Sequence, residues 1–160
     1  MKINRVLLLG LVLVKSVFVA ASQERCVPVG MLCEYLSNPL GIDALHPRLR
    51  WHLDDVRDKA MQKACRVLVS TDSLKLADKN YADCWDTGKR KTETMQFVYN
   101  GKKLLPFTKY FWKVEVWDKD GNKTSSDIAS FETGMLEMHN WRGSWISDGR
   151  DMDYKPAPYF

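Results

Sequence analysis

The stretch that decides the fold runs from residue 104 to residue 118 and reads Leu104-Leu-Pro-Phe-Thr-Lys-Tyr-Phe-Trp-Lys-Val-Glu-Val-Trp-Asp118. Successive side chains of a β-strand point to opposite faces of the sheet. One face of this strand is apolar and holds Tyr110, Trp112, Val114 and Val116. The other face holds Phe111, Lys113, Glu115 and Trp117. The Asp120-Gly121 step that follows is typical of a hairpin turn. The stretch therefore predicts a long strand that begins near Leu104, is buried on one face and ends in a turn.

Working outward, the rest of the chain predicts six more short strands and one short helix. The strands are expected at residues 29–36, 47–53, 64–70, 84–89, 95–99 and 126–133, and the helix within 73–82. Turn residues separate most of these segments, and there is no glycine-rich phosphate loop or long helix. The pattern favours an all-β fold, an antiparallel seven-stranded β-sandwich. Alternation predicts a core of Leu49, Trp51, Leu53, Val67, Val69, Tyr110, Trp112, Val114 and Val116.

The first 21 residues have the pattern of a secretory signal peptide. Lys2 and Arg5 precede an apolar run at residues 6–14, and Val19 and Ala21 occupy the small-residue positions before a cleavage site. The alternative is an uncleaved membrane anchor, which needs about 20 apolar residues, but Lys15 interrupts this run. Cleavage after Ala21 would make the protein secreted or periplasmic. It would also leave 21 basic and 20 acidic residues, a balance that does not indicate nucleic acid or a membrane as partner.

Composition shifts divide the chain into three parts. We expect a signal peptide at residues 1–21, a β-sandwich at 22–134, and at 135–160 a linker followed by the start of a second β domain. Trp141 and Trp145 lie four residues apart in the last part, and a monomer rarely leaves such side chains exposed. The final residues, from Pro156 to Phe160, resemble the opening of a strand. The sequence therefore predicts a chain that is truncated within its second domain.

The cysteines and histidines give no metal signal. The four cysteines Cys26, Cys33, Cys65 and Cys84 could form two disulfides in any of three pairings. A buried free thiol is an equal alternative for Cys65, which lies in an apolar strand. The histidines His46, His52 and His139 are scattered, and no CxxC motif is present. We expect no metal site and no cofactor.

The acidic residues do not form a catalytic pattern either. The carboxylates Asp54, Asp55, Asp83, Asp86, Asp118 and Asp120 all fall in loops or at strand ends, where they are typical of turns and solvated charges. No serine and histidine are arranged as nucleophile and base. The sequence thus predicts no catalytic residue. Phe111 and Trp117 could stack on a sugar, but packing against a neighbouring domain or strand is favoured.

The corner at residues 104–110 carries a first resemblance. Its Leu-x-Pro-x-Thr-x-Tyr spacing resembles the corner strand of fibronectin type III domains, in which a buried tyrosine hydroxyl bonds to upstream backbone. This resemblance implies that the hydroxyl of Tyr110 bonds to backbone within residues 104–107.

A second resemblance covers almost all of the chain after residue 21. It rests on an ordered series: Cys33-Glu-Tyr-Leu-Ser-Asn-Pro-Leu-Gly-Ile-Asp43, Pro47-Arg-Leu-Arg-Trp51, Trp85-Asp-Thr-Gly-Lys89, Tyr110-Phe-Trp-Lys-Val-Glu-Val-Trp-Asp118, Phe131-Glu-Thr-Gly134 and Trp141 to Ile146. The series closely resembles the N-terminal domain of bacterial α-L-rhamnosidases.

This resemblance implies an exported multidomain glycosidase that removes terminal α-L-rhamnose with inversion, using two acidic groups of a separate helical domain. The chain is then a non-catalytic fragment, inactive alone, with the downstream domains as partners and carbohydrate as a further candidate partner. The alternative is a stand-alone secreted carbohydrate-binding or protein-interaction β-sandwich module.

Overall fold

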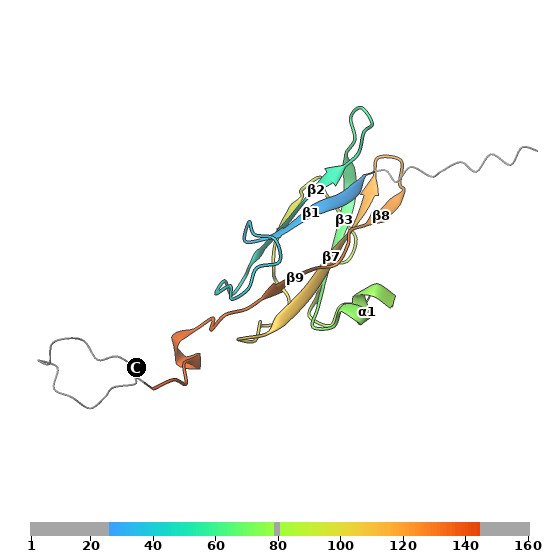
Figure 1. The fold of residues 1–160 in the computed structure, drawn as a ribbon. Coiled ribbons are helices and arrows are strands. Elements are labelled where there is room, and N and C mark those ends of the chain that lie inside the picture. The colour runs from blue at the N-terminus through green and yellow to red at the C-terminus, as the bar shows by residue number, and fades with distance from the viewer. Residues whose placement is uncertain (1–25, 79–80, 145–160) are drawn as a thin grey trace, which may run out of the picture.

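The computed structural model describes residues 26–78 and 81–144, which form two antiparallel sheets packed face to face (Figure 1). The smaller sheet has the order β1 (Val27–Cys33), β2 (Arg48–Asp54), β6 (Gln96–Val98). The larger sheet is built on β3 (Gln62–Ser70) and β7 (Lys109–Asp118), which pair along most of their length. Its edges are β4 (Trp85–Asp86), β5 (Arg90–Lys91), β8 (Lys123–Ser125) and β9 (Ala129–Glu132).

The nine strand segments of the described residues amount to seven strands, because two edge strands are each split into two segments. Segments β4 and β5 both pair with β3, and Gly88 between them has a φ of 63°. Segments β8 and β9 both pair with β7. Between those two segments, the hydroxyl of Ser126 accepts the N–H of Val114 at 3.0 Å. A side-chain oxygen thus takes the place of the backbone carbonyl that would accept this N–H in a regular β-ladder. The predicted seven-stranded all-β sandwich is confirmed in this sense.

The core lies between the sheets and matches the predicted set. Eight of the nine predicted residues are at most 2% exposed, and Leu53 is the half-buried exception at the edge of the cluster. Buried Gln62 supplies one polar contact inside this core. Its side-chain oxygen accepts the indole N–H of Trp51 at 3.2 Å, and its amide donates to the carbonyl of Thr94 at 2.6 Å. These bonds satisfy polar groups that burial would otherwise penalise.

The entry into β7 corrects the expected strand start at Leu104. The strand begins at Lys109, and the residues before it form a loop in which Phe107 has a φ of 51°. The hydroxyl of Thr133, distant in sequence, holds this loop by accepting the N–H of Thr108 at 2.9 Å and donating to the carbonyl of Leu105 at 2.6 Å. The predicted tyrosine contact is confirmed, because the hydroxyl of Tyr110 accepts the N–H of Leu105 at 2.8 Å.

Removing that hydroxyl should destabilise the domain. We expect Tyr110→Phe to lower the free energy of unfolding by about 1–3 kcal/mol, because the N–H of Leu105 loses its acceptor in a partly buried site. Tyr35→Phe is the matched control, since Tyr35 is 52% exposed and its hydroxyl contacts only the exposed Arg48. Urea unfolding of both variants measures the difference. Equal stability of the two would contradict the role given to the Tyr110 hydroxyl.

Two other strand boundaries differ from expectation. The first strand ends at Cys33, because Glu34 and Tyr35 both have positive φ and form a two-residue turn. Cys33 and Leu36 close this turn with reciprocal backbone bonds of 2.9 and 3.0 Å. The last expected strand, at residues 126–133, is shorter in the structure and corresponds to β9. Strand β8, which precedes it, was not predicted.

Helix α1 (Ser73–Asp78) covers part of the outer face of the larger sheet, beside β3 and β7 (Figure 1). Lys113 points outward as predicted but is only 8% exposed, and its ammonium group donates to the carbonyl of Leu76 in the helix. Burial lowers the pKa of Lys113. The face opposite the core is therefore partly closed by a short helix whose Leu76 is fully buried.

All four cysteines are free thiols, so the disulfide alternative is not what the structure shows. Cys26, Cys33 and Cys65 are fully buried, and burial raises the pKa of Cys33 to about 12 and that of Cys65 to about 11. They act as packing residues with little thiolate character. None of the helices in the described ranges has the length and apolar character needed to cross a membrane. The predicted signal peptide, Trp145 and residues 156–160 lie outside the described residues.

Candidate domain-contact surface

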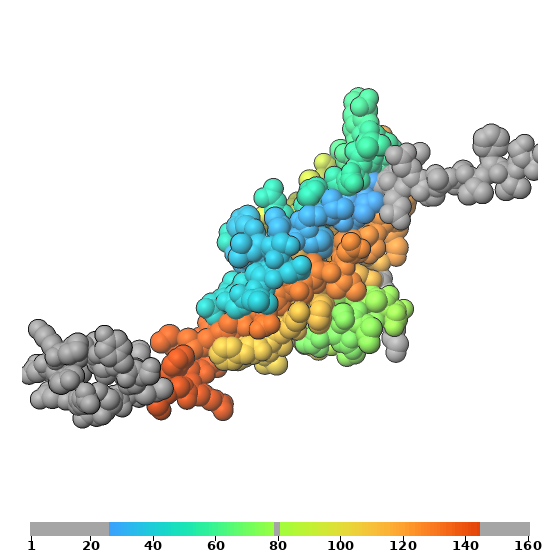
Figure 2. All heavy atoms as spheres, in the orientation of Figure 1, coloured from blue at the N-terminus to red at the C-terminus, as the bar shows by residue number. Residues whose placement is uncertain are grey.

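Exposed apolar side chains gather at the end of the sandwich where the chain leaves β9. They come from the loop before β7 and from the short 3-10 helix η1 (Met138–Asn140) with the residue after it. We call this the exit surface; it consists of Leu105, Phe107, Met138 and Trp141, with exposed fractions of 60%, 67%, 80% and 61%. Figure 2 shows the segment after β9 as an orange end that projects from the body of the molecule.

A hollow borders Phe107 and Trp141 of the exit surface. This shallow hollow of about 470 Å³ is lined by Pro106, Phe107, Asn140, Trp141, Arg142 and Gly143. Two aromatic side chains from distant parts of the sequence thus border the same concavity. An apolar hollow at a chain exit suits the side chains of an adjoining domain.

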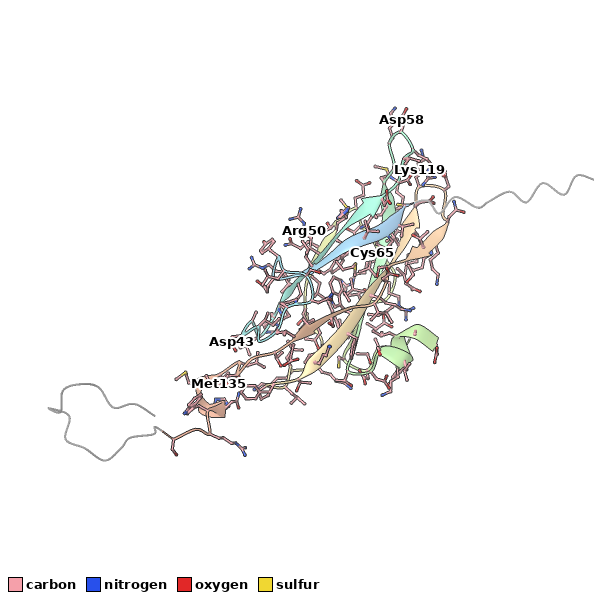
Figure 3. The ribbon with its side chains drawn as sticks, viewed as in Figure 1. Asp43, Arg50, Asp58, Cys65, Lys119 and Met135 are labelled. Atoms are coloured by element: carbon pink, nitrogen blue, oxygen red, sulfur yellow. The ribbon has the colours of Figure 1, made fainter. Side chains whose placement is uncertain are left out.

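Hydrogen bonds fix the path of the exit segment. Gly134 donates its N–H to the carbonyl of Ile42 at 2.8 Å and accepts the N–H of Phe107 at 2.9 Å. The carboxylate of Asp43 accepts the N–H of Leu136 at 2.8 Å, and Figure 3 places Asp43 and Met135 at this same end. A Cβ on Gly134 would lie 2.6 Å from that carboxylate, so the approach requires glycine. The direction in which the chain leaves is therefore set by the sandwich.

The backbone is strained at one residue of the exit surface and at one residue of the segment that leads to it. Phe107 has a φ of 51° and Leu136 a φ of 63°, a conformation that costs about 1–2 kcal/mol for residues with a Cβ. Such strain persists where the surrounding structure imposes it, and it concentrates at functional sites. Here the contacts of Gly134 and Asp43 impose it and hold the Phe107 ring at the surface.

Three of the scattered carboxylates meet at the opposite end of the sandwich, where Figure 3 labels Asp58 and Lys119. The guanidinium of Arg57 donates to Asp55 at 2.6 Å, to Asp118 at 2.9 Å and to Asp120 at 2.8 Å. Asp118 also accepts the N–H groups of Asp120 and Asn122 at 2.9 Å each, which shapes the turn after β7. The cluster joins the β2–β3 loop to the β7–β8 turn.

The remaining acidic candidates have separate partners. Asp86 is bound by the guanidinium of Arg66 at 2.7 Å, and Asp83 accepts the backbone N–H of Thr71 at 3.0 Å. Asp54 lies exposed at the end of β2. The structure therefore does not bring Asp54, Asp83 or Asp86 to a common site with the Arg57 cluster.

The electrostatics of these carboxyl groups oppose general-acid chemistry. The Arg57 guanidinium lowers the pKa of Asp55 to about 2. Burial alone would raise the pKa of Asp118, but hydrogen bonds from Asn122 and Arg57 hold it below its ordinary value. The carboxyl pKa is displaced downward in Glu34, Asp55, Asp83, Asp86 and Asp118. A glycosidase general acid needs the reverse displacement.

Acid should weaken the Arg57 cluster. The pKa of Asp55 is about 2 in the folded chain, below the ordinary value of about 4, so its contribution to stability is complete above about pH 4 and is lost as the pH falls toward 2. Urea midpoints of the chain and of Arg57→Gln, compared between about pH 5 and pH 2, measure this loss. The variant should show a shallower decline, and parallel curves would contradict the assignment.

The histidines that the sequence offered as candidates have separate partners. The ring of His46 lies 3.0 Å from the carbonyl of Tyr99, His52 packs over Gly30, and His139 pairs with Glu137. Within residues 26–78 and 81–144, no group of three or more histidine, cysteine or acidic side chains is placed to hold a metal. Of the aromatic candidates, Trp141 joins the exit surface, whereas Phe111 and Trp117 lie on the outer face of the larger sheet.

The sequence interpretation did not anticipate Leu105 and Phe107 in the exit surface. It began the long strand near Leu104 and gave these two side chains no role. A usable signal was present, because two large apolar residues flanking Pro106 do not suit the solvated face of a strand.

Comparisons with known proteins give a consistent family. The family model described as Rha78A-like, N-terminal immunoglobulin domain, matches residues 28–137. An α-L-rhamnosidase of Streptomyces avermitilis is 39% identical over 126 residues, which cover 78% of this chain and 12% of that protein. An α-L-rhamnosidase of Formosa agariphila is 31% identical over 170 residues, covering 99% of this chain and 18% of that protein. The chain therefore spans less than a fifth of the length of these relatives.

Solved structures agree. The α-L-rhamnosidase from Dictyoglumus thermophilum superimposes with a TM-score of 0.71 at 38% identity, covering 76% of this chain and 14% of that one. The Aspergillus terreus enzyme, with a TM-score of 0.58 at 19% identity, covers 72% of this chain and 13% of that one and shows the common fold. The chain belongs to the Rha78A-like N-terminal immunoglobulin domains, the β-sandwich domain that it shares with α-L-rhamnosidases.

Proposed function

We propose that the chain serves as the non-catalytic N-terminal module of an exported α-L-rhamnosidase, an enzyme that hydrolyses terminal α-L-rhamnose from glycosides or polysaccharides. Its part is architectural: the exit surface packs against the domain that follows and fixes that domain's orientation. The observation that carries the proposal is the position of the exit surface, directly where the chain leaves the sandwich.

The relatives support the architectural role. The matched segments make up only 12–18% of the curated α-L-rhamnosidases, so most of each of those enzymes lies outside this domain. The Formosa agariphila match covers 99% of this chain, and so includes sequence beyond the sandwich. In the relatives the sandwich is thus joined to further polypeptide.

The energetics favour a covered exit surface. Fully burying a large apolar side chain contributes about 1.5–3 kcal/mol, and the four side chains of this surface are more than half exposed. Interfaces between domains of one chain are commonly of modest size and mixed polarity. A few large apolar side chains around a hollow, with Asn140 and Arg142 at its border, suit such an interface.

Export rests on the signal-peptide pattern of residues 1–21. Cleavage after Ala21 would leave the mature protein in the periplasm or outside the cell. N-terminal sequencing of protein recovered from outside the cytoplasm tests this, and a mature chain that begins at Ser22 is the expected result. Recovery of the intact N-terminus in the membrane fraction would contradict it.

A domain replacement tests the architectural role. In the Streptomyces avermitilis enzyme, the matching segment is exchanged for this chain, and the chimera is assayed for hydrolysis of an aryl α-L-rhamnoside and for thermal stability. We expect a folded, active chimera. The double change Phe107→Ser and Trp141→Ser should lower its melting temperature, because both rings lose their contact with the next domain.

The matched control is Val56→Ser with Leu74→Ser, since these side chains are 81% and 68% exposed and lie away from the exit surface. This pair should leave the melting temperature unchanged. Equal effects of the two pairs in the chimera, or equal effects of the exit-surface pair in the chimera and in the isolated chain, would contradict the proposal.

A further inference from the structure

A row of side chains crosses the outer face of the larger sheet, away from the exit surface. Strand pairing places Lys91 opposite Ala64, Ala64 opposite Trp117, and Trp117 opposite Lys123. Directly paired residues share a face, and neighbouring strands lie about 4.8 Å apart. The four residues therefore form one line across β5, β3, β7 and β8, with a lysine at each end and an indole between them.

Lysine ammonium groups are held around that indole. The Nζ atom of Lys89 lies 4.3 Å from the centre of the Trp117 ring, and that of Lys123 lies 6.0 Å from it. Cation–π attraction fixes both groups at one ring despite their like charge. The carboxylate of Glu115 already pairs with Lys123 at 2.8 Å, so an anion beside the ring would bind chiefly to Lys89.

The cations at one end of the row lack acidic partners. Lys89 and Lys91 are exposed, and neither pairs with a carboxylate in the described part of the chain. Arg90, between them, is paired with core-facing Cys65 and so belongs to the other face of the sheet, where it donates to the carbonyl of Thr87 at 3.2 Å. The two carboxylates beside the row are already bound, Asp86 by Arg66 and Glu115 by both Arg66 and Lys123.

We propose that this basic row, made of Lys89, Lys91, Trp117 and Lys123, binds an acidic polysaccharide through its carboxylate or sulfate groups. The row extends across four strands, about 14 Å at the usual strand spacing, which suits an extended polymer better than a single ion. The half-buried indole of Trp117 adds an apolar surface for a sugar ring beside cations that bind its acidic groups.

A glycan fits the row better than a nucleic acid. Domains that bind nucleic acid usually carry a large net positive charge, whereas residues 22–160 hold 21 basic and 20 acidic residues. The positive charge here is local, which is why net charge did not reveal it. The row is also separate from the exit surface, so this inference does not depend on the architectural role.

Calorimetric titration of the purified chain tests the inference with four polymers: polygalacturonate, dextran sulfate, neutral dextran and duplex DNA. We expect binding to polygalacturonate, to dextran sulfate or to both, which distinguishes carboxylate from sulfate recognition. Affinity should fall at about 0.5 M salt, because the contacts are ionic and exposed. Neutral dextran should not bind, and duplex DNA should bind at least about tenfold more weakly than the preferred glycan.

Two variants with equal charge change locate the site. The double change Lys89→Gln and Lys91→Gln should weaken glycan binding at least about tenfold. The control Lys59→Gln and Lys119→Gln removes two exposed cations elsewhere and should stay within about twofold of the parent. Trp117→Leu should weaken the glycan more than DNA, with thermal melting confirming that it folds. Equal loss in the two double variants, DNA binding as tight as glycan binding, or no glycan binding would overturn the inference.

Discussion

Replacing Trp112 with alanine should leave the domain largely unfolded at about 37 °C, because the loss approaches its whole stability. Trp112 is fully buried at the centre of β7, in the core between the sheets. Truncating a buried tryptophan to alanine costs about 3–5 kcal/mol through lost burial and the cavity left behind. Small domains hold about 5–15 kcal/mol in total.

Trp112→Phe is the informative control for this core. The indole N–H of Trp112 is buried without a hydrogen-bond partner, so phenylalanine removes no hydrogen bond and keeps most of the apolar contact. Its cost should be well under half that of alanine. Thermal unfolding followed by near-ultraviolet circular dichroism separates the two. An alanine variant that melts with the parent would refute the core assignment.

The second large loss is expected for Phe131→Ala on β9. Phe131 is fully buried and stacks on Tyr110, with 5.2 Å between the ring centres. We expect a cost of about 3–5 kcal/mol, because the short β9 has few other apolar contacts with which to stay in the sheet. Since β9 leads directly into Gly134, the same change should loosen the exit segment.

Phe111→Ala is the matched control for Phe131, because it removes the same ring from the half-exposed outer face of β7, opposite Ser130. Its cost should be less than half as large. Chemical denaturation gives both values, and amide hydrogen exchange at residues 134–141 reports on the exit segment. Similar costs for the two variants would show that burial against Tyr110 is not what holds β9.

Alternation predicted the sheets because it is a local property of each strand. The paired faces of β2, β3 and β7 follow from residues two apart, and the structure confirms them. The loop at residues 104–108 could not be obtained this way. Its shape depends on Thr133 and Gly134, which lie 25 or more residues away and override the alternation by hydrogen bonding to the loop backbone.

The functional surfaces were predictable only in part, for the same reason. Trp141 stood out in the sequence as an aromatic residue beyond the last strand, whereas Phe107 needed the fold to place it beside Trp141. The Arg57 cluster joins residues 61 and 63 positions apart. The basic row could be recognised only from the register of the strands, because Lys91 and Lys123 lie at the two ends of a line that crosses four strands.

We propose that this chain contributes architecture and not catalysis to an α-L-rhamnosidase. Release of chromophore from an aryl α-L-rhamnoside by the purified chain at high concentration tests this proposal. The assay is repeated with Asp54→Asn, Asp86→Asn and Asp118→Asn to test the carboxylates that the sequence offers. We expect no turnover above background for the parent chain or for any of the variants. Turnover by the parent chain that one of these substitutions abolishes would contradict the proposal and make the chain an enzyme.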